Sequence, residues 1–78
     1  MTSKNLALMV RLMVHEDELI ALEKRAHAAR VTMAEVCRRA GKHRQSWSRA
    51  RRRGRAEYTL IDPLEKAMAT IESERATA

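Results

Sequence analysis

Apolar side chains recur at three- and four-residue steps between Glu16 and Arg30, and charged side chains lie between them. This spacing places the apolar positions on one side of a helix and the charges on the other. The apolar positions are Leu19, Leu22, Ala26 and Ala29. The first turn is acidic and the last turn is basic, which complements the helix dipole. The pattern therefore predicts an amphipathic helix over residues 16–30.

Two shorter helices are predicted mainly from the residues at their ends. Thr32 and Glu35 form the pattern of a capping box, in which the hydroxyl accepts from the Glu35 amide and the carboxylate reaches back to the Thr32 amide. Gly41 suits the left-handed residue that ends a helix, so a helix is expected over about 33–40. A third helix is expected from Arg44 to Arg53, before Gly54. Two helices joined by a short turn that contains Gly form a helix-turn-helix unit.

A fourth helix is predicted after a loop. Asp62 followed by Pro63 suits an N-cap and a first helical residue, because Pro has no amide to leave unpaired there. Thr59 is a competing cap that would start the helix three residues earlier. The expected apolar side of this helix is Leu60, Leu64, Met68 and Ile71. Residues from Ser73 onward are expected to fray.

Residues 6–14, LALMVRLMV, are apolar almost throughout, and periodicity does not distinguish a helix from a strand here. In either form the segment needs cover on more than one side. We expect a second copy of the chain to supply it, although ordinary core packing within one chain is the alternative. The candidate dimerisation residues are Leu6, Leu8, Val10 and Leu12. The apolar run is too short to span a bilayer, so a cytoplasmic protein without membrane contact is expected.

Composition supports one small helical domain. The chain has 78 residues, of which 45% are apolar, with one Trp, one Tyr, no Phe, two Gly and one Pro. Aliphatic residues with few Gly and Pro favour helices. The expected fold is all-α, a compact domain of four to five helices. Its expected parts are an apolar extension over 1–15, a helix-turn-helix domain over 16–73 and a frayed tail over 74–78. The single Cys37 excludes a disulfide within one chain.

The positive charge is concentrated in one window. Residues 36–55 hold nine basic and no acidic side chains, whereas the rest of the chain holds seven basic and ten acidic ones. The whole net charge of +6 therefore lies in this window. Concentrated positive charge attracts a polyanion, most often nucleic acid and less often anionic lipid.

The arginines of the helix predicted over 44–53 fall into different groups when faces are assigned at 100° per residue. Trp47 and Ala50 share one side with Gly54, and Arg51 lies at its edge without an assigned role. A large indole gains most by facing the core, which turns the opposite side outward. That outer side consists of Arg44, Gln45, Ser48, Arg49 and Arg52. Arg can pair with guanine and Gln with adenine in the DNA major groove. Lys42, Arg53 and Arg55 flank the helix and are candidate phosphate contacts.

The stretch TMAEVCRRAG, followed by KHRQSWSRA, resembles the helix-turn-helix of lambda-repressor-like (Cro/C1-type, also called XRE) transcription regulators, especially small phage and bacterial members. That family commonly has a Thr cap, an Ala-Glu pair, a small residue in the first helix, a Gly at the turn and a bulky apolar residue six positions later. The matching residues are Thr32, Ala34, Glu35, Cys37, Gly41 and Trp47. The resemblance covers about residues 17–72. It implies base contacts from Arg44, Gln45 and Arg49 with His43 and Ser48 beside them, and a phosphate contact near Thr32.

These observations predict a sequence-specific double-stranded DNA-binding regulator, with repression as the expected effect and a homodimer as the expected form. Two copies would place their third helices in successive major grooves, about 34 Å apart, on a palindromic operator. We expect no catalysis, cofactor, metal or small-molecule substrate, because zinc-ligand spacings and a nucleophile with an oriented base are missing. The alternatives are a nonspecific or architectural nucleic-acid binder, including one that stacks Trp47 on a base, and a small protein-interaction module of the phage-encoded inhibitor type.

Overall fold

The computed structural model describes residues 13–77 of the chain. In order, the elements are β1 (Met13–His15), α2 (Glu16–Ala28), α3 (Met33–Arg39), α4 (Arg44–Arg53), β2 (Arg55–Glu57) and α5 (Tyr58–Thr77). The described residues thus form a mostly helical domain with four helices and one small two-stranded sheet. The helical class expected from the sequence is confirmed, and the sheet is an addition to the expected all-α architecture.

The sheet pairs the segment before α2 with the segment between α4 and α5. β1 pairs antiparallel with β2, so that Val14 lies opposite Ala56 and His15 lies opposite Arg55. Val14 and Ala56 are both buried, and their neighbours along the strands are more exposed. Residues 13–15 therefore adopt the strand alternative for the N-terminal segment. The candidate dimerisation residues Leu6, Leu8, Val10 and Leu12 lie outside the described residues.

β2 occupies a stretch that the sequence predicted to be loop. Three residues with only one buried position are too short for a two-residue period to be recognised. The strand forms because Ala56 is buried in the core and because β1 pairs with β2 through backbone hydrogen bonds. The paired residues lie 40 to 44 positions apart in the sequence, so local pattern does not predict this pairing.

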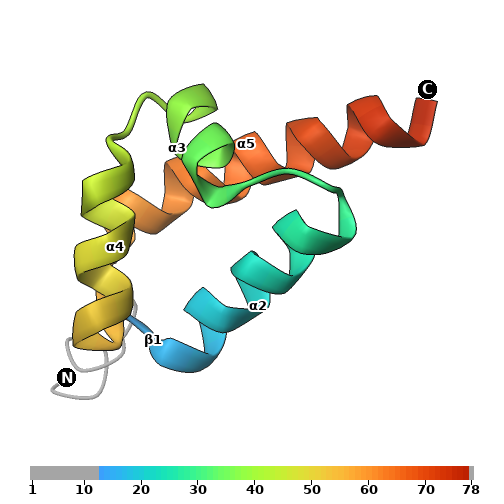
Figure 1. Cartoon of the computed structure of the whole chain (residues 1–78). Helices are drawn as coiled ribbons and strands as arrows, with labels where there is room; N and C mark the ends of the chain where they lie inside the picture. The colour runs from blue at the N-terminus through green and yellow to red at the C-terminus, as the bar shows by residue number, and fades with distance from the viewer. Residues whose placement is uncertain (1–12, 78) are drawn as a thin grey trace, which may run out of the picture.

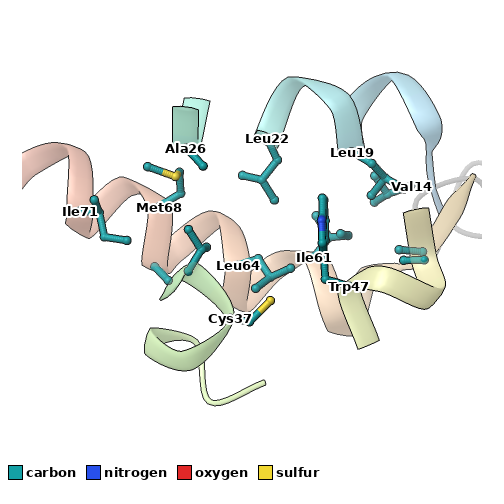
Figure 2. Packing of buried hydrophobic residues seen from close by; sticks show 14 residues of the cluster. Val14, Leu19, Leu22, Ala26, Cys37, Trp47, Ile61, Leu64, Met68 and Ile71 are labelled. Carbon is teal, nitrogen blue, oxygen red and sulfur yellow. The ribbon is translucent and has the colours of Figure 1, made fainter. Parts of the chain in front are cut away.

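The long helix α5 packs against both α2 and α3, and α4 packs against α3 and β2 (Figure 1). Figure 1 shows α4 at one end of the domain, crosswise to the C-terminal part of α5. The most deeply buried side chains are Leu19, Leu22, Val36, Cys37, Leu64 and Met68. Figure 2 shows Leu22, Leu64 and Trp47 pointing into the same interior from α2, α5 and α4. Apolar side chains from all four helices thus share one core.

The ends of α2 and α3 are closed by similar backbone hydrogen bonds. After α3, the amide of Lys42 donates to the Cys37 carbonyl, and Gly41 has a φ of 71°, which confirms the predicted left-handed stop. After α2, the amide of Val31 donates to the Ala26 carbonyl, and Arg30 takes the left-handed position with a φ of 59°. The helix predicted over 16–30 therefore ends at Ala28, two residues early.

The capping box at the start of α3 forms only in part. The Thr32 hydroxyl accepts from the Glu35 amide at 3.1 Å, as predicted. The Glu35 carboxylate, however, accepts from Arg38 and also lies near Arg39. A charged donor on the same helix competes with the Thr32 amide, since a charge-assisted hydrogen bond is stronger than a neutral one.

The last helix begins at Tyr58, so the predicted start at Asp62 and Pro63 is wrong and the Thr59 alternative is closer. Pro63 lies inside the helix. The earlier start places Ile61 in the core and leaves Leu60 only half-buried, which explains why the helix continues upstream of the proline. Asp62 accepts a hydrogen bond from the Tyr58 hydroxyl and pairs with Lys66.

Candidate nucleic-acid interface

The helix α4 has an apolar inner side and a polar outer side. Trp47 and Ala50 are each only 5% exposed, which confirms the inward direction predicted for the indole. The outer side consists of exposed Arg44, Gln45, Ser48, Arg49 and Arg52. Every residue predicted to contact bases from within this helix is therefore accessible, and burial of the Trp47 ring on the inner side turns these side chains outward.

Both ends of α4 are fixed by local interactions. His43 is the N-cap, and its Nδ1 accepts from the Gln45 amide at 3.2 Å. An Nδ1 that accepts leaves the proton of a neutral imidazole on Nε2, so the exposed His43 ring keeps one donor. At the other end, Gly54 has a φ of 76° and stops the helix where the sequence predicts. The last turn is basic, and its positive side chains interact favourably with the negative end of the helix dipole.

The inner side of α4 is tied to α2 through Glu23. Its Oε2 accepts from Nε1 of Trp47 at 3.1 Å and lies 3.1 Å from Nε of Arg51. Nη1 of Arg51 is buried and lies 3.5 Å from Oε1 of Glu16, without a hydrogen-bond partner among the described residues. Arg51, which the sequence left unassigned, therefore belongs to the contact between α2 and α4.

Some basic side chains of the described residues form ion pairs and others form none, and Lys24, Arg30 and Arg75, outside the window 42–55, belong to those that form none. Arg25, Arg38, Arg39, Arg51 and Lys66 each pair with at least one carboxylate. Within residues 13–77, the basic side chains of the window 42–55 that form no ion pair are Lys42, Arg44, Arg49, Arg52, Arg53 and Arg55. All six are exposed. We call these six the unpaired cations.

Four of the unpaired cations line one groove beside α4. The groove has a volume of about 270 Å³ and lies between α4, β2 and the start of α5. Its basic lining residues are Lys42, Arg49, Arg53 and Arg55, and Glu57 is an acidic one. The structure thus brings the candidate phosphate contacts Lys42, Arg53 and Arg55 together, and it adds Arg49 from the outer side of the helix.

Thr32, the remaining candidate phosphate contact, lies elsewhere. It lines a different groove of about 510 Å³ together with Arg30, Arg39 and Arg75. Two carboxylates, Glu35 and Glu74, line the same groove, and both pair with Arg39. The charge around Thr32 is therefore mixed, whereas the groove beside α4 is mainly positive.

Pairing and burial also shift pKa values. The hydrogen bond from Arg25 holds the pKa of the Glu72 carboxyl below its usual range, and the bond from Arg39 does the same for the pKa of Glu74. Burial raises the pKa of the Cys37 thiol, which has no exposed surface. A buried neutral thiol fits core packing, as expected from the small residue at this position.

No family model, curated protein or solved structure matches the chain. The candidate interface therefore rests on the geometry of its own residues. Across residues 13–77, His, Cys, Asp and Glu side chains form no group of three or more that could hold a metal ion. Over the same range, no helix combines the length and the apolar character needed to cross a bilayer.

The sequence did not predict the carboxylates of α2 that pair with the inner side of α4. Glu23 and Glu16 determine which arginine of the run is neutralised, yet in the sequence they are only polar positions of an amphipathic helix. The spacing of Trp47 and Arg51, one helical turn apart, is a signal that two donors lie in line on one side. It does not identify the partner, because Glu23 lies 24 positions from Trp47.

Proposed function

We propose that this protein is a sequence-specific double-stranded DNA-binding transcription regulator of the lambda-repressor-like type. In this proposal α3 and α4 form a helix-turn-helix, and α4 enters the major groove. One observation carries the proposal: the cations on the outer side of α4 form no ion pairs within residues 13–77, whereas Arg51 on the inner side is held by carboxylates. Unpaired donors on an exposed helix can bind an anionic partner without first breaking an internal contact.

The outer side of α4 offers suitable groups for base recognition. Arg44 and Arg49 can each donate two hydrogen bonds to O6 and N7 of guanine, and Gln45 can pair with N6 and N7 of adenine. Gln45 and Arg49 lie one turn apart, so both can follow the floor of one groove. Ser48 and Arg52 extend this contact toward the C-terminal end of the helix, and the Nε2 donor of His43 extends it toward the N-terminal end.

The groove beside α4 suits the DNA backbone. Lys42, Arg53 and Arg55 lie on its lining and would contact phosphates on one flank of the major groove. Arg49 lines the same groove and also belongs to the outer side of α4. Its position would allow contact with a base or with a phosphate. The Thr32 hydroxyl, which accepts from Glu35, still has a proton to donate to a second phosphate.

We further propose that the protein acts as a homodimer and represses by occupying a palindromic operator. One copy offers a single recognition helix, and two copies related by a two-fold axis double the number of base contacts. The residues assigned to dimerisation fall outside the described part of the chain. Repression is the simplest effect, because occupation of a site requires no additional surface.

Selection of binding sites from random duplex DNA, at one stated salt concentration, tests this function. The proposal predicts an enriched half-site that recurs with two-fold symmetry, with half-site centres about 10 base pairs apart. The matched control is the triple variant Arg44→Ala, Gln45→Ala, Arg49→Ala, which should enrich no sequence. If the wild-type protein binds DNA without enriching a half-site, the nonspecific alternative is correct and the proposal fails.

The protein-interaction alternative has a separate test. It predicts that the same triple variant keeps its function in the cell, whereas changes at Leu8 and Leu12 abolish it. The DNA proposal predicts that the triple variant loses function. Comparison of these variants under equal expression decides between the two classes.

A further inference from the structure

We infer that Glu23 is a positioning residue that fixes the rotation of α4 about its own axis and thereby sets which side chains face DNA. This inference deepens the proposed function and rests on it for its consequence in DNA binding. It starts from one atom: Oε2 of Glu23 lies 3.1 Å from Nε1 of Trp47 and 3.1 Å from Nε of Arg51.

Trp47, which donates a hydrogen bond to Glu23, and Arg51, which forms an ion pair with it, are one turn apart on the inner side of α4. A line through them runs roughly along the helix axis, because residues four apart lie almost directly above one another. A carboxylate held on this line resists rotation of α4, since turning the helix moves the Trp47 N–H and the Arg51 guanidinium away from it in the same direction. Neutral apolar contacts at Ala50 lack this directional preference, because hydrophobic contact is non-directional.

The contact is partly shielded from water, which increases its effect. Trp47 is 5% exposed as a residue, and the side chains of Glu23 and Arg51 are 35% and 29% exposed. The hydrogen bond from Trp47 has a carboxylate acceptor, and such charge-assisted hydrogen bonds are shorter and stronger than neutral ones. Glu16 adds a second carboxylate next to Arg51, so the guanidinium is held from two positions on α2.

The rotation of α4 about its axis matters because base recognition tolerates only small displacements of the contacting side chains. Side chains that form a binding constellation need to be held within about 0.5 Å and 10–20° of their productive geometry. Phosphate contact by flexible Lys and Arg side chains tolerates more movement. Loss of Glu23 should therefore lower the preference for the selected sequence much more than it lowers the affinity for unrelated DNA.

Two pairs of variants test this: Glu23→Gln and Glu23→Ala, matched with Glu72→Gln and Glu72→Ala. Glu72 is a suitable control because it also receives hydrogen bonds from an arginine between two helices, Arg25, and its removal changes the net charge equally. Its hydrogen bonds come from Arg25 on α2 and not from α4. We expect Glu23→Ala to lower the ratio of specific to nonspecific affinity about tenfold or more, with a smaller loss for Glu23→Gln, which keeps an acceptor oxygen. We expect both Glu72 variants to keep the wild-type ratio.

Nuclear magnetic resonance of the free protein supplies a second readout that does not depend on DNA. Trp47 is the only Trp of the chain, so its indole N–H signal is unambiguous. We expect Glu23→Ala to move this signal and the backbone amide signals of residues 44–53, and Glu72→Ala to leave them in place. If Glu23→Ala does not fold, the two Gln variants are compared by the same measurements.

The outcomes separate the two proposals. If the wild-type protein enriches no half-site, the proposed function fails, and the α4 amide signals still decide whether Glu23 orients the helix. If the wild-type protein is specific, but the Glu23 and Glu72 variants have equal specificity ratios, Glu23 has no positioning role. Equal, small shifts of the α4 signals in both Ala variants would also overturn the inference.

Discussion

Arg49 and Arg51 lie two positions apart on α4, yet they differ in what they contact. Arg51 points toward α2, where Glu23 and Glu16 neutralise it. Arg49 is exposed, lines the groove beside α4 and forms no ion pair within residues 13–77. A run of like charges therefore contains side chains with different tasks. The inner cation holds the helix, and the outer cation is available to a partner.

The contrast between paired and unpaired arginines also distinguishes the α2 and α5 side of the domain from the outer side of α4. On the α2 and α5 side, Arg25 is shared by Glu65 and Glu72, and these contacts raise the pKa of Arg25 above its usual range. Partly exposed ion pairs contribute little to stability, about 0–1 kcal/mol each. Their main consequence here is electrostatic, because they neutralise Arg25 between α2 and α5, whereas the six unpaired cations around α4 keep their charge.

The largest expected effect is the loss of the inner anchor of α4. Trp47→Ala should lower the free energy of unfolding by about 3–5 kcal/mol, because it removes a buried ring and leaves a cavity. Urea unfolding monitored by circular dichroism measures this. Ser48→Ala, at the exposed neighbouring position, should change it by less than about 0.5 kcal/mol. If both variants lost equally little stability, the assignment of an inner side to α4 would be wrong.

The next effect concerns base recognition from the outer side. Arg49→Ala should weaken binding to the selected operator by about 1–3 kcal/mol and relax the preference at one base pair. Titration of the operator and of its single-base variants measures both quantities. Arg38→Ala, which removes an exposed arginine paired with Glu35 on α3, should leave the preference unchanged. An unchanged base preference in Arg49→Ala would contradict a base contact at this position.

His43 has two roles, since its Nδ1 caps α4 and its Nε2 can donate a hydrogen bond to a partner. His43→Ala should lower the free energy of unfolding by about 1 kcal/mol, the usual effect of losing an N-cap. His43→Asn should retain most of the stability, because Asn is a good N-cap acceptor. Thermal unfolding distinguishes them, and the capping role is refuted if Asn destabilises as much as Ala.

The smallest effect is the acid sensitivity of the paired side. Glu72 has a pKa lowered by the hydrogen bond from Arg25, so this pair stabilises the fold above the usual value of 4.5 and the contribution is lost as pH falls through the lowered pKa. At about pH 7, Glu72→Gln should be less stable than the wild-type protein by less than about 1 kcal/mol. The difference between the two should shrink as pH falls below 4.5 through the lowered pKa of Glu72. A difference that grew in acid would contradict the sign of the shift.

The sequence predicted the helices best where both ends carry a strong local signal. α4 begins at Arg44 and ends before Gly54 as predicted, because a glycine stop and an inward Trp47 are local features. The start of α5 was placed too late, because the Asp62–Pro63 cap signal was outweighed by burial of Ile61, a tertiary effect. β2 was missed because its pairing with β1 joins segments far apart in the sequence.

The sequence predicted which residues of α4 are exposed, but not which arginine of the run pairs with carboxylates. The outer residues of α4 follow from helical periodicity and one large indole, and the structure places them as exposed. The pairing of Arg51 with Glu23 and Glu16 depends on how α2 packs beside α4, which periodicity does not contain. The groove that collects Lys42, Arg53 and Arg55 likewise depends on β2 and the start of α5.

The salt dependence of DNA binding by Arg55→Ala and Arg38→Ala tests the central claim most directly, namely that unpaired cations bind DNA while paired ones do not. The logarithm of the binding constant is plotted against the logarithm of salt concentration for one duplex. Arg55→Ala should weaken binding to all sequences alike and reduce the slope by about one, because one phosphate contact is lost. Arg38→Ala should keep the wild-type slope. Equal slopes for the two variants would contradict the account.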